Sequence, residues 1–208
     1  KLKGMVDGTG SRRLILNMPS RYGKSLALCW FLVWLYDRIP TSQSIYSCYG
    51  DDLANEHAVF VRDRLSENAG ELRTQLRVDR RRMDRFVTTH GGGLLAAGID
   101  SGIIGFGAGG GGGVICDDPF KNWQEAHSPT RRDHVWNQFR AVLRTRLNDD
   151  DAWMAVVHHR MHEDDPTGRL RDAMEQESGE AWEVVTIAAL AEAGRPDPLD
   201  RMPGEVIE

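Results

Sequence analysis

The stretch NMPSRYGKSLALCWF, from Asn17 to Phe31, decides how the rest of the chain is interpreted. It ends as a phosphate-binding loop does, because Gly23, Lys24 and Ser25 lead directly into an apolar segment. It begins differently, since Met18 stands five residues before Gly23, where the usual pattern has its first glycine. The stretch is either a nucleotide site of variant form or a chance GKS tripeptide, and the residues around it have to distinguish the two.

The surroundings of this stretch favour a nucleotide site. The apolar run from Arg12 to Met18 predicts a buried strand, and residues 23–37 contain no glycine or proline after Gly23, which predicts a buried helix. Such a loop binds phosphate through backbone N–H groups at a helix N-terminus, a lysine on the β- and γ-phosphates, and a hydroxyl on Mg²⁺. The predicted ATP contacts are Ser20, Arg21, Tyr22, Gly23, Lys24, Ser25 and Leu26, with Ser25 also binding the metal.

A second motif, GVICDDP from Gly113 to Pro119, lies about 90 residues further on. In P-loop NTPases a hydrophobic strand ends in an aspartate that binds Mg²⁺, and an acid often follows that orients the attacking water. Asp117 is the predicted metal ligand and Asp118 the predicted water-orienting residue, with Glu125 as the alternative. Two adjacent acids can also be an ordinary turn, but both motifs in this order argue against coincidence.

Composition excludes several other classes of protein. A chain of 208 residues forms one domain most simply, and its net charge of −5 argues against a surface that is basic throughout. Its longest apolar run has 11 residues, whereas a membrane span needs about 20. Three widely spaced cysteines predict buried thiols in a reducing compartment. The arginine-rich segment from Arg77 to Arg85 predicts either a local phosphate-binding patch or a solvated helix face.

Apolar segments of strand length alternate with helical ones along the chain. Besides those named, residues 44–49, 151–159 and 182–190 predict strands, and residues 85–98 predict a β-hairpin. Residues 51–70, 129–147 and 165–177 predict helices, with Asp51 capping the first and Ser128 the second. Twelve of the 22 glycines lie between Gly91 and Gly113, which predicts either a flexible linker or, because VICDD follows, a mobile loop within the domain. The alternation predicts an α/β fold with a mainly parallel sheet, whose ligands lie at the carboxyl ends of the strands.

A third motif, HHRMHEDDPTGRL, begins at His158, where another predicted strand ends. The spacing of His158 and His162, with carboxylates following, permits a metal site as an alternative. The motif lacks the glutamate that follows the first histidine in the zinc-protease pattern, and a strand does not bring this spacing to one ligand.

With these three elements in place, the sequence resembles the large terminase subunit of tailed bacteriophages, the ATPase of the DNA-packaging motor. The resemblance rests on MPSRYGKS, on VICDDPFKNWQEAHSPTRRDHVWNQF and on RMHEDDPTGRL, where Met161 stands in place of a more usual tryptophan. It implies a P-loop NTPase of the ASCE type that uses ATP and Mg²⁺. It also implies catalytic roles for Lys24, Asp118, Arg21 and Arg160, the last as the arginine of the coupling motif.

The resemblance further implies the setting in which the protein works. Its expected partners are double-stranded DNA, a portal protein, a small terminase subunit and further copies of itself in a ring on the portal, with no membrane. The expected location is the host cytoplasm, on the procapsid during packaging. Residues 1–194 are the expected ATPase domain and residues 195–208 the start of a linker towards a nuclease domain. An adenine-binding segment is expected upstream.

The chain departs from the family pattern at several points. Asp118 stands where many members have glutamate, His158 and His159 replace small hydroxyl residues, and the glycine run before Val114 lacks a basic residue. The arginine that neutralises the transition state is therefore either Arg21 in the same chain or one of Arg140, Arg144 and Arg146 from a neighbouring chain. Two other functions remain open: another P-loop DNA motor such as a helicase or recombination ATPase, and a degenerate module that binds DNA or scaffolds assembly without hydrolysis.

Overall fold

One mixed sheet runs through the computed structural model, which describes residues 1–207 apart from the side chain of Arg81. Its eight strands follow the order β3-β4-β5-β2-β6-β7-β1-β8. The strands are β1 (Arg13–Asn17), β2 (Gln43–Cys48), β3 (Leu76–Arg81), β4 (Arg85–Thr88), β5 (Gly93–Gly98), β6 (Gly113–Asp117), β7 (Trp153–His158) and β8 (Glu183–Thr186). Every neighbouring pair from β5 to β8 is parallel, whereas β3 and β4 add an antiparallel hairpin at the edge. The predicted α/β architecture with a mainly parallel sheet is confirmed.

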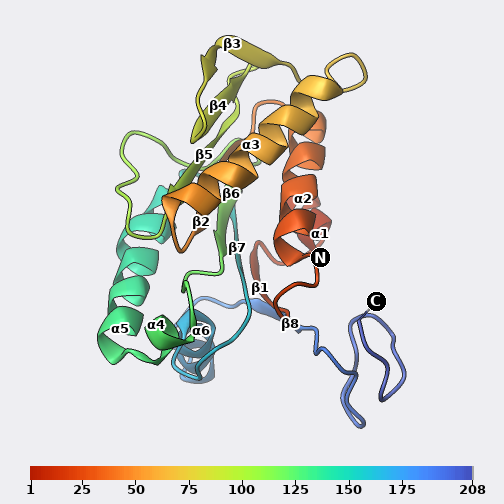
Figure 1. Ribbon diagram of the computed structural model, residues 1–208, viewed down its shortest axis with the longest axis vertical. Helices are drawn as coiled ribbons and strands as arrows, with labels where there is room; N and C mark the ends of the chain where they lie inside the picture. The colour runs from red at the N-terminus through yellow and green to blue at the C-terminus, as the bar shows by residue number, and fades with distance from the viewer. Residues whose placement is uncertain (208) are drawn as a thin grey trace.

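Helices cover both faces of this sheet, as Figure 1 shows for α2 and α3 on one side and α5 on the other. The helices are α1 (Leu2–Asp7), α2 (Lys24–Arg38), α3 (Asp51–Glu67), α4 (Trp123–His127), α5 (Pro129–Gln138) and α6 (Pro166–Glu175). No helix among residues 1–207 is long and apolar enough to cross a membrane. The short helix α1 was not predicted from the sequence.

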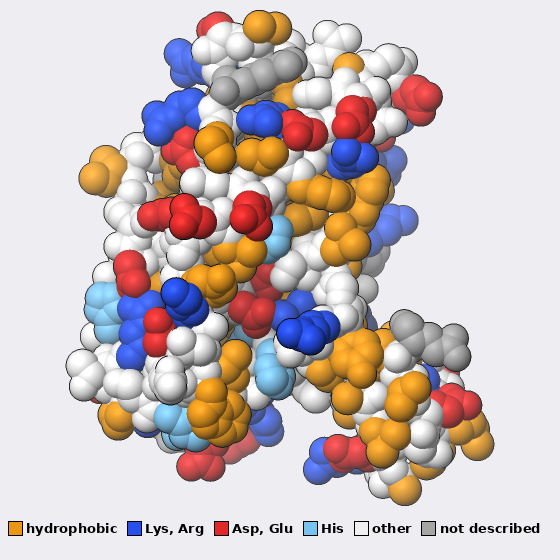
Figure 2. Space-filling view, viewed as in Figure 1, with side chains coloured by type: hydrophobic (Ala, Val, Ile, Leu, Met, Phe, Trp, Pro, Cys, Tyr) orange, Lys and Arg blue, Asp and Glu red, His pale blue; other side chains and the backbone are white. Residues whose placement is uncertain are grey.

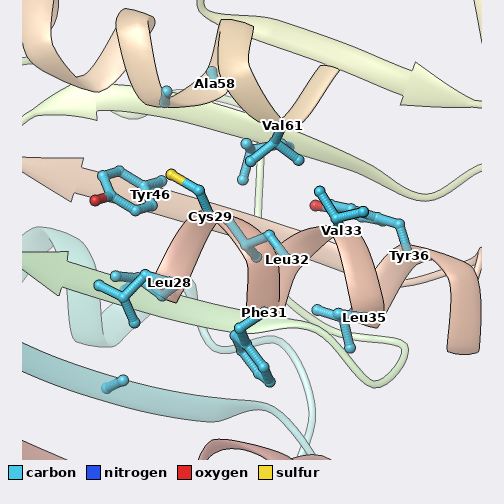
Figure 3. Close-up of a cluster of buried hydrophobic side chains, with 14 of the residues drawn as sticks. Leu28, Cys29, Phe31, Leu32, Val33, Leu35, Tyr36, Tyr46, Ala58 and Val61 are labelled. Carbon is cyan, nitrogen blue, oxygen red and sulfur yellow. The ribbon is translucent and has the colours of Figure 1, made fainter. Parts of the chain in front are cut away.

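Two apolar cores form because most strands are buried on both faces, which is why their sequences are continuous apolar runs rather than alternating ones. Alternate residues of each strand point to opposite cores: Ile115 packs with α2 and α3, and Cys116 packs with α4, α5 and α6. Figure 3 shows the first core, where Leu28 and Leu32 of α2 and Ala58 and Val61 of α3 gather over the strands. The three cysteines are buried free thiols, as predicted.

Two predicted helices differ from the structure in how they begin or end. Gly50, not Asp51, is the N-cap of α3, because the Asp51 carboxylate accepts hydrogen bonds from the Gly98 N–H and the Ser101 hydroxyl. The helix predicted over 129–147 is α-helical only to Gln138 and continues as a π-turn (Phe139–Leu143) and a 3₁₀ turn (Arg144–Arg146). The π-turn keeps both Phe139 and Leu143 buried in the second core.

The arginine-rich segment is a strand and not a helix face. Residues from Leu76 to Arg81 form β3, which pairs with β4 at the edge of the sheet. The predicted hairpin of β4 and β5 is confirmed. Figure 2 shows Lys and Arg side chains at the top of the molecule, over β3 and β4, with acidic side chains beside them.

The glycine-rich segment from Gly91 to Gly113 is part of the domain and not a flexible linker. Its apolar residues Ile103, Phe106 and Ala108 are buried in the second core, and Ala108 bridges to Leu147. At its end, a Cβ on Gly113 would lie 2.2 Å from the Trp153 carbonyl oxygen, so only glycine allows the two strands to approach there.

The C-terminal segment folds back on itself after β8. Leu190 bridges to Val206, and Arg201 donates hydrogen bonds to the Asp197 carboxylate and to the Ala188 carbonyl. The predicted linker covers residues 195–208, of which Glu208 lies outside the described residues. The boundary at residue 194 stays a prediction.

Candidate active site

The phosphate-loop stretch lies at the carboxyl end of β1 and leads into α2, as its sequence predicted. Gly23 is the N-cap of α2 with φ 77°, a left-handed conformation that glycine adopts without strain. Arg21 is also left-handed, with φ 69°, which bends the loop a second time. Ser20, Arg21 and Tyr22 are exposed. The first N–H groups of a helix have no partners within the helix, so this end of α2 suits an anion.

Lys24 is the buried cation of the site. Its side chain is 6% exposed, and its Nζ lies 2.5 Å from Asp118 Oδ2, although the two residues are far apart in the sequence. Asp118 Oδ1 accepts a hydrogen bond from the His159 N–H at 2.9 Å. The backbone of Asp118 has φ 42°, a left-handed conformation that aspartate tolerates better than most residues. The start of α2 and the residue that follows β7 thus meet at this carboxylate, which itself follows β6.

Asp117 lies beside this pair and is almost completely buried, at 1% exposure. Its Oδ2 accepts a hydrogen bond from the Tyr46 hydroxyl at 2.5 Å. Its Oδ1 is buried with no hydrogen-bond partner among the described residues. Burial and the charge of Asp118 raise the pKa of Asp117 to about 6, although Ser25, Tyr46 and Lys24 lie close enough to oppose this shift.

The site fits a hard divalent cation on the side of Asp117. Such cations prefer carboxylate and hydroxyl oxygens, and a buried carboxylate oxygen without a partner is costly unless a cation or a donor satisfies it. Asp117 Oδ1 and the Ser25 hydroxyl are the oxygens that would hold Mg²⁺. Burial, followed by the charge of Asp117, raises the pKa of Tyr46 well above its ordinary value, so that hydroxyl keeps its proton and donates.

The third motif lies at the same edge, but its arginine is engaged locally. Arg160 donates hydrogen bonds to the Asp165 carboxylate at 3.0 Å and to the Glu163 carbonyl at 2.9 Å. Arg160 also lines a cavity of about 340 Å³ together with Met18 and Pro19, the two residues that replace the usual start of the phosphate loop. Arg160 is therefore a neighbour of the loop and does not contact Lys24 in the described part of the chain.

The two histidines of this motif have separate partners. His158 is buried, and its Nε2 lies 2.8 Å from Thr167 Oγ1, which in turn donates to Asn17 Oδ1 at 3.3 Å. Burial lowers the pKa of His158. His162 accepts a hydrogen bond from the Asp164 N–H and packs edge-on against His127. The structure does not bring His158 and His162 to one ligand, which leaves the alternative of a shared metal site without support.

The other predicted residues lie away from this centre. Glu125 accepts hydrogen bonds from Arg131 and from the Lys121 N–H. The guanidinium of Arg140 lies over the Trp136 ring at 5.8 Å, and Arg144 pairs with Glu180 at 3.0 Å. Because the π-turn and the 3₁₀ turn follow α5, Arg140 and Arg144 do not lie on one continuous α-helix, although the sequence predicted a helix over 129–147.

Three residues of the site were not anticipated from the sequence. Tyr46 on β2 donates to Asp117, His57 on α3 packs against the Tyr46 ring, and Asn17 at the end of β1 accepts a hydrogen bond from Thr167. Tyr46 lies in an apolar segment that predicts only a buried strand. The one available signal was the phenol itself, since a buried tyrosine hydroxyl usually has a partner.

Comparisons with known proteins agree with this architecture. No family model and no curated protein matches the sequence. Among solved structures, the chain is similar to the large terminase from a thermophilic bacteriophage, with a TM-score of 0.57 and 13% sequence identity over 89% of this chain. The similarity extends over 44% of that terminase, so this chain spans less than half of its length. The predicted resemblance is therefore confirmed at the level of the fold: this chain is built like part of a phage large terminase.

Proposed function

We propose that this chain is an ATP-hydrolysing motor domain of a terminase large subunit, a P-loop ATPase of the ASCE type that moves double-stranded DNA into a procapsid. The observation that carries the proposal is the arrangement of Lys24, Asp117 and Asp118 beside the N-terminus of α2. One buried cation, one buried carboxylate oxygen without a partner among the described residues and one further carboxylate lie at one sheet edge. That set matches the needs of phosphoryl transfer, which depends on positioning and on compensating charge.

Each residue has a distinct task in the proposed reaction. The loop N–H groups and Lys24 bind the phosphates of ATP, and Lys24 exchanges Asp118 for the β- and γ-phosphates. Asp118, still held by the His159 N–H, then orients the attacking water. Ser25 and Asp117 Oδ1 hold Mg²⁺, which when bound offsets negative charge on the phosphates. The hydrogen bonds from Tyr46 and from the His159 N–H hold the two carboxylates in place before the reaction.

The exposed arginine of the β3–β4 hairpin supports the proposal of a DNA partner. Arg77 pairs with Asp79 and Arg82 with Asp84, whereas Arg80 is exposed and forms no ion pair within the described residues. A duplex attracts such arginines through its phosphates even when the protein is acidic overall. A portal protein, a small terminase subunit, a ring of like chains and a nuclease domain in a longer protein complete the proposed motor.

The proposal is tested by measuring ATP hydrolysis with and without double-stranded DNA, in the unaltered chain and in Lys24→Ala. Hydrolysis that DNA stimulates and that Lys24→Ala abolishes is the expected result. Hydrolysis that is absent from the unaltered chain would instead identify a degenerate module. Co-sedimentation with a portal or procapsid distinguishes a terminase from a helicase or recombination ATPase.

A further inference from the structure

The two oxygens of the Asp117 carboxylate have different surroundings. Oδ2 accepts the Tyr46 hydroxyl at 2.5 Å, and Oδ1 is buried with no partner among the described residues. A carboxylate that is free to rotate about its Cβ–Cγ bond exchanges its two oxygens. A short hydrogen bond to one of them fixes the plane of the group and leaves the other pointing in one direction.

Tyr46 is itself held rigidly. It is completely buried on β2, next to β6, with Ile115 of β6 as its register partner. His57 from α3 packs edge-on against the Tyr46 ring, with centroids 5.0 Å apart and an interplanar angle of 68°. Figure 3 shows the ring beside Cys29, between α2 and the sheet. The hydroxyl therefore stays in one position, because the ring has no room to take another rotamer.

A role in shaping the core does not explain the hydroxyl. Phenylalanine fills the same space in an apolar core, and a buried hydroxyl is costly unless it has a partner. The Tyr46 hydroxyl has the Asp117 carboxylate as its partner, on a different strand and 71 residues away in the sequence. The hydroxyl orients the carboxylate of Asp117, and Asp117 is the proposed protein carboxylate ligand of the metal.

We infer that Tyr46 is a positioning residue for the divalent cation: it fixes Asp117 through Oδ2 so that Oδ1 is directed at the metal. This inference rests on the proposed function. It predicts that removal of the hydroxyl lowers the affinity for the divalent cation and leaves phosphate binding by the loop intact. Lys24, Ser25 and the N-terminus of α2 do not depend on Tyr46. Residues that orient metal ligands in this way typically change metal affinity about 10–100-fold when mutated.

The decisive variant is Tyr46→Phe, with Tyr36→Phe as its matched control. Tyr36 is equally buried in the same core and donates its own hydroxyl bond, at 2.8 Å, to the Gly93 carbonyl. In Figure 3, Tyr36 and Tyr46 lie at opposite ends of α2. Both variants remove one buried hydroxyl and keep the ring, so a general loss of stability affects both. Only Tyr46→Phe removes the hydrogen bond to Asp117.

The measurement is Mn²⁺ affinity by electron paramagnetic resonance in the presence of ADP, together with ADP affinity by calorimetry in EDTA. Tyr46→Phe is expected to bind Mn²⁺ about 10–100-fold more weakly than the unaltered chain. Its ADP affinity in EDTA is expected to stay within about twofold, and Tyr36→Phe is expected to match the unaltered chain in both measurements.

Three outcomes overturn the inference, and they distinguish its failure from that of the proposed function. Unchanged Mn²⁺ affinity in Tyr46→Phe, or an equal loss in Tyr36→Phe, shows that the hydroxyl serves the core alone and leaves the proposed ATPase standing. Absence of both ADP and Mn²⁺ binding in the unaltered chain overturns the proposed function and this inference with it.

Discussion

Lys24 Nζ lies 2.5 Å from Asp118 Oδ2, so the proposed phosphate-binding cation and the proposed water-orienting carboxylate neutralise each other directly. Lys24 is 6% exposed, and an isolated charge at that depth would be strongly unfavourable. The pair explains how one edge of the sheet keeps a lysine and two aspartates close together. It also means that phosphate and Asp118 compete for the same ammonium group.

Lys24→Ala is expected to reduce the ATP hydrolysis rate by at least about 10²–10³-fold, because the lysine is the buried cation closest to the transferred charge. The measurement is the initial rate of phosphate release with Mg²⁺. Lys3→Ala is the control, since Lys3 is an exposed lysine of α1 that pairs only with Asp7 among the described residues. A Lys24→Ala rate near that of the unaltered chain would refute the assignment of the site.

Asp118→Asn is expected to retain ATP affinity and lose turnover, because the carboxylate acts on the attacking water and not on the bound ground state. Asparagine tolerates the left-handed backbone with φ 42° and still accepts the His159 N–H, so the loop keeps its shape. Single-turnover kinetics and calorimetry separate the two effects. Turnover that survives in Asp118→Asn but is lost in Glu125→Gln would transfer the role to Glu125.

The arginine that completes the site is expected to come from a neighbouring chain. Arg140 is exposed and lies over Trp136 without a carboxylate partner among the described residues, whereas Arg144 is paired with Glu180. Mixing Arg140→Ala with Lys24→Ala should therefore partly restore the hydrolysis that each variant lacks, and Arg144→Ala is the comparison. No recovery at any mixing ratio, together with inactive Arg21→Ala, would show that Arg21 completes the site within one chain.

Buried His158 is expected to lower the stability of the fold as the pH falls, an effect that the raised pKa of Asp117, about 6, opposes in the lower part of the range. Burial lowers the pKa of His158 from the ordinary 6.5, so below that pH the unfolded chain takes up a proton that the folded chain refuses. The unfolding free energy should fall by up to about 1.4 kcal/mol per pH unit until the folded-state pKa is reached. Urea unfolding between pH 7.5 and about 5 should show a shallower decline for His158→Gln than for His90→Gln, an exposed control. Equal slopes would contradict the assignment.

Arg80→Gln is expected to weaken double-stranded DNA binding at low salt and to reduce the slope of log affinity against log salt by about 0.9, the value for one lost phosphate contact. Lys3→Gln removes one exposed charge on α1 and should leave the slope unchanged. Fluorescence anisotropy over a salt series measures both. Identical slopes for the two variants would exclude the β3–β4 hairpin from the DNA interface.

The sequence alone determined the class of the fold and predicted that three charged residues lie at one edge of the sheet. Strand and helix patterns are local, because burial on two faces or on one stripe fixes which positions are apolar. The carboxyl ends of parallel strands share one edge, so placing Lys24, Asp117 and Asp118 each after a buried strand was enough to predict that they lie together.

Tertiary structure alone decided the strand order, the π-turn and the partner of Asp117. The insertion of β7 between β1 and β6 depends on how both cores pack, which no single segment encodes. Likewise, the sequence predicts a continuous α-helix through Phe139, whereas the structure has a π-turn from Phe139 to Leu143. In the sequence Tyr46 is one more apolar strand residue, and only the pairing of β2 with β6 brings its hydroxyl to a carboxylate 71 residues away. The periodicity of a sequence predicts which face of a strand or helix a residue lies on. Which residue it contacts there depends on how the elements pack.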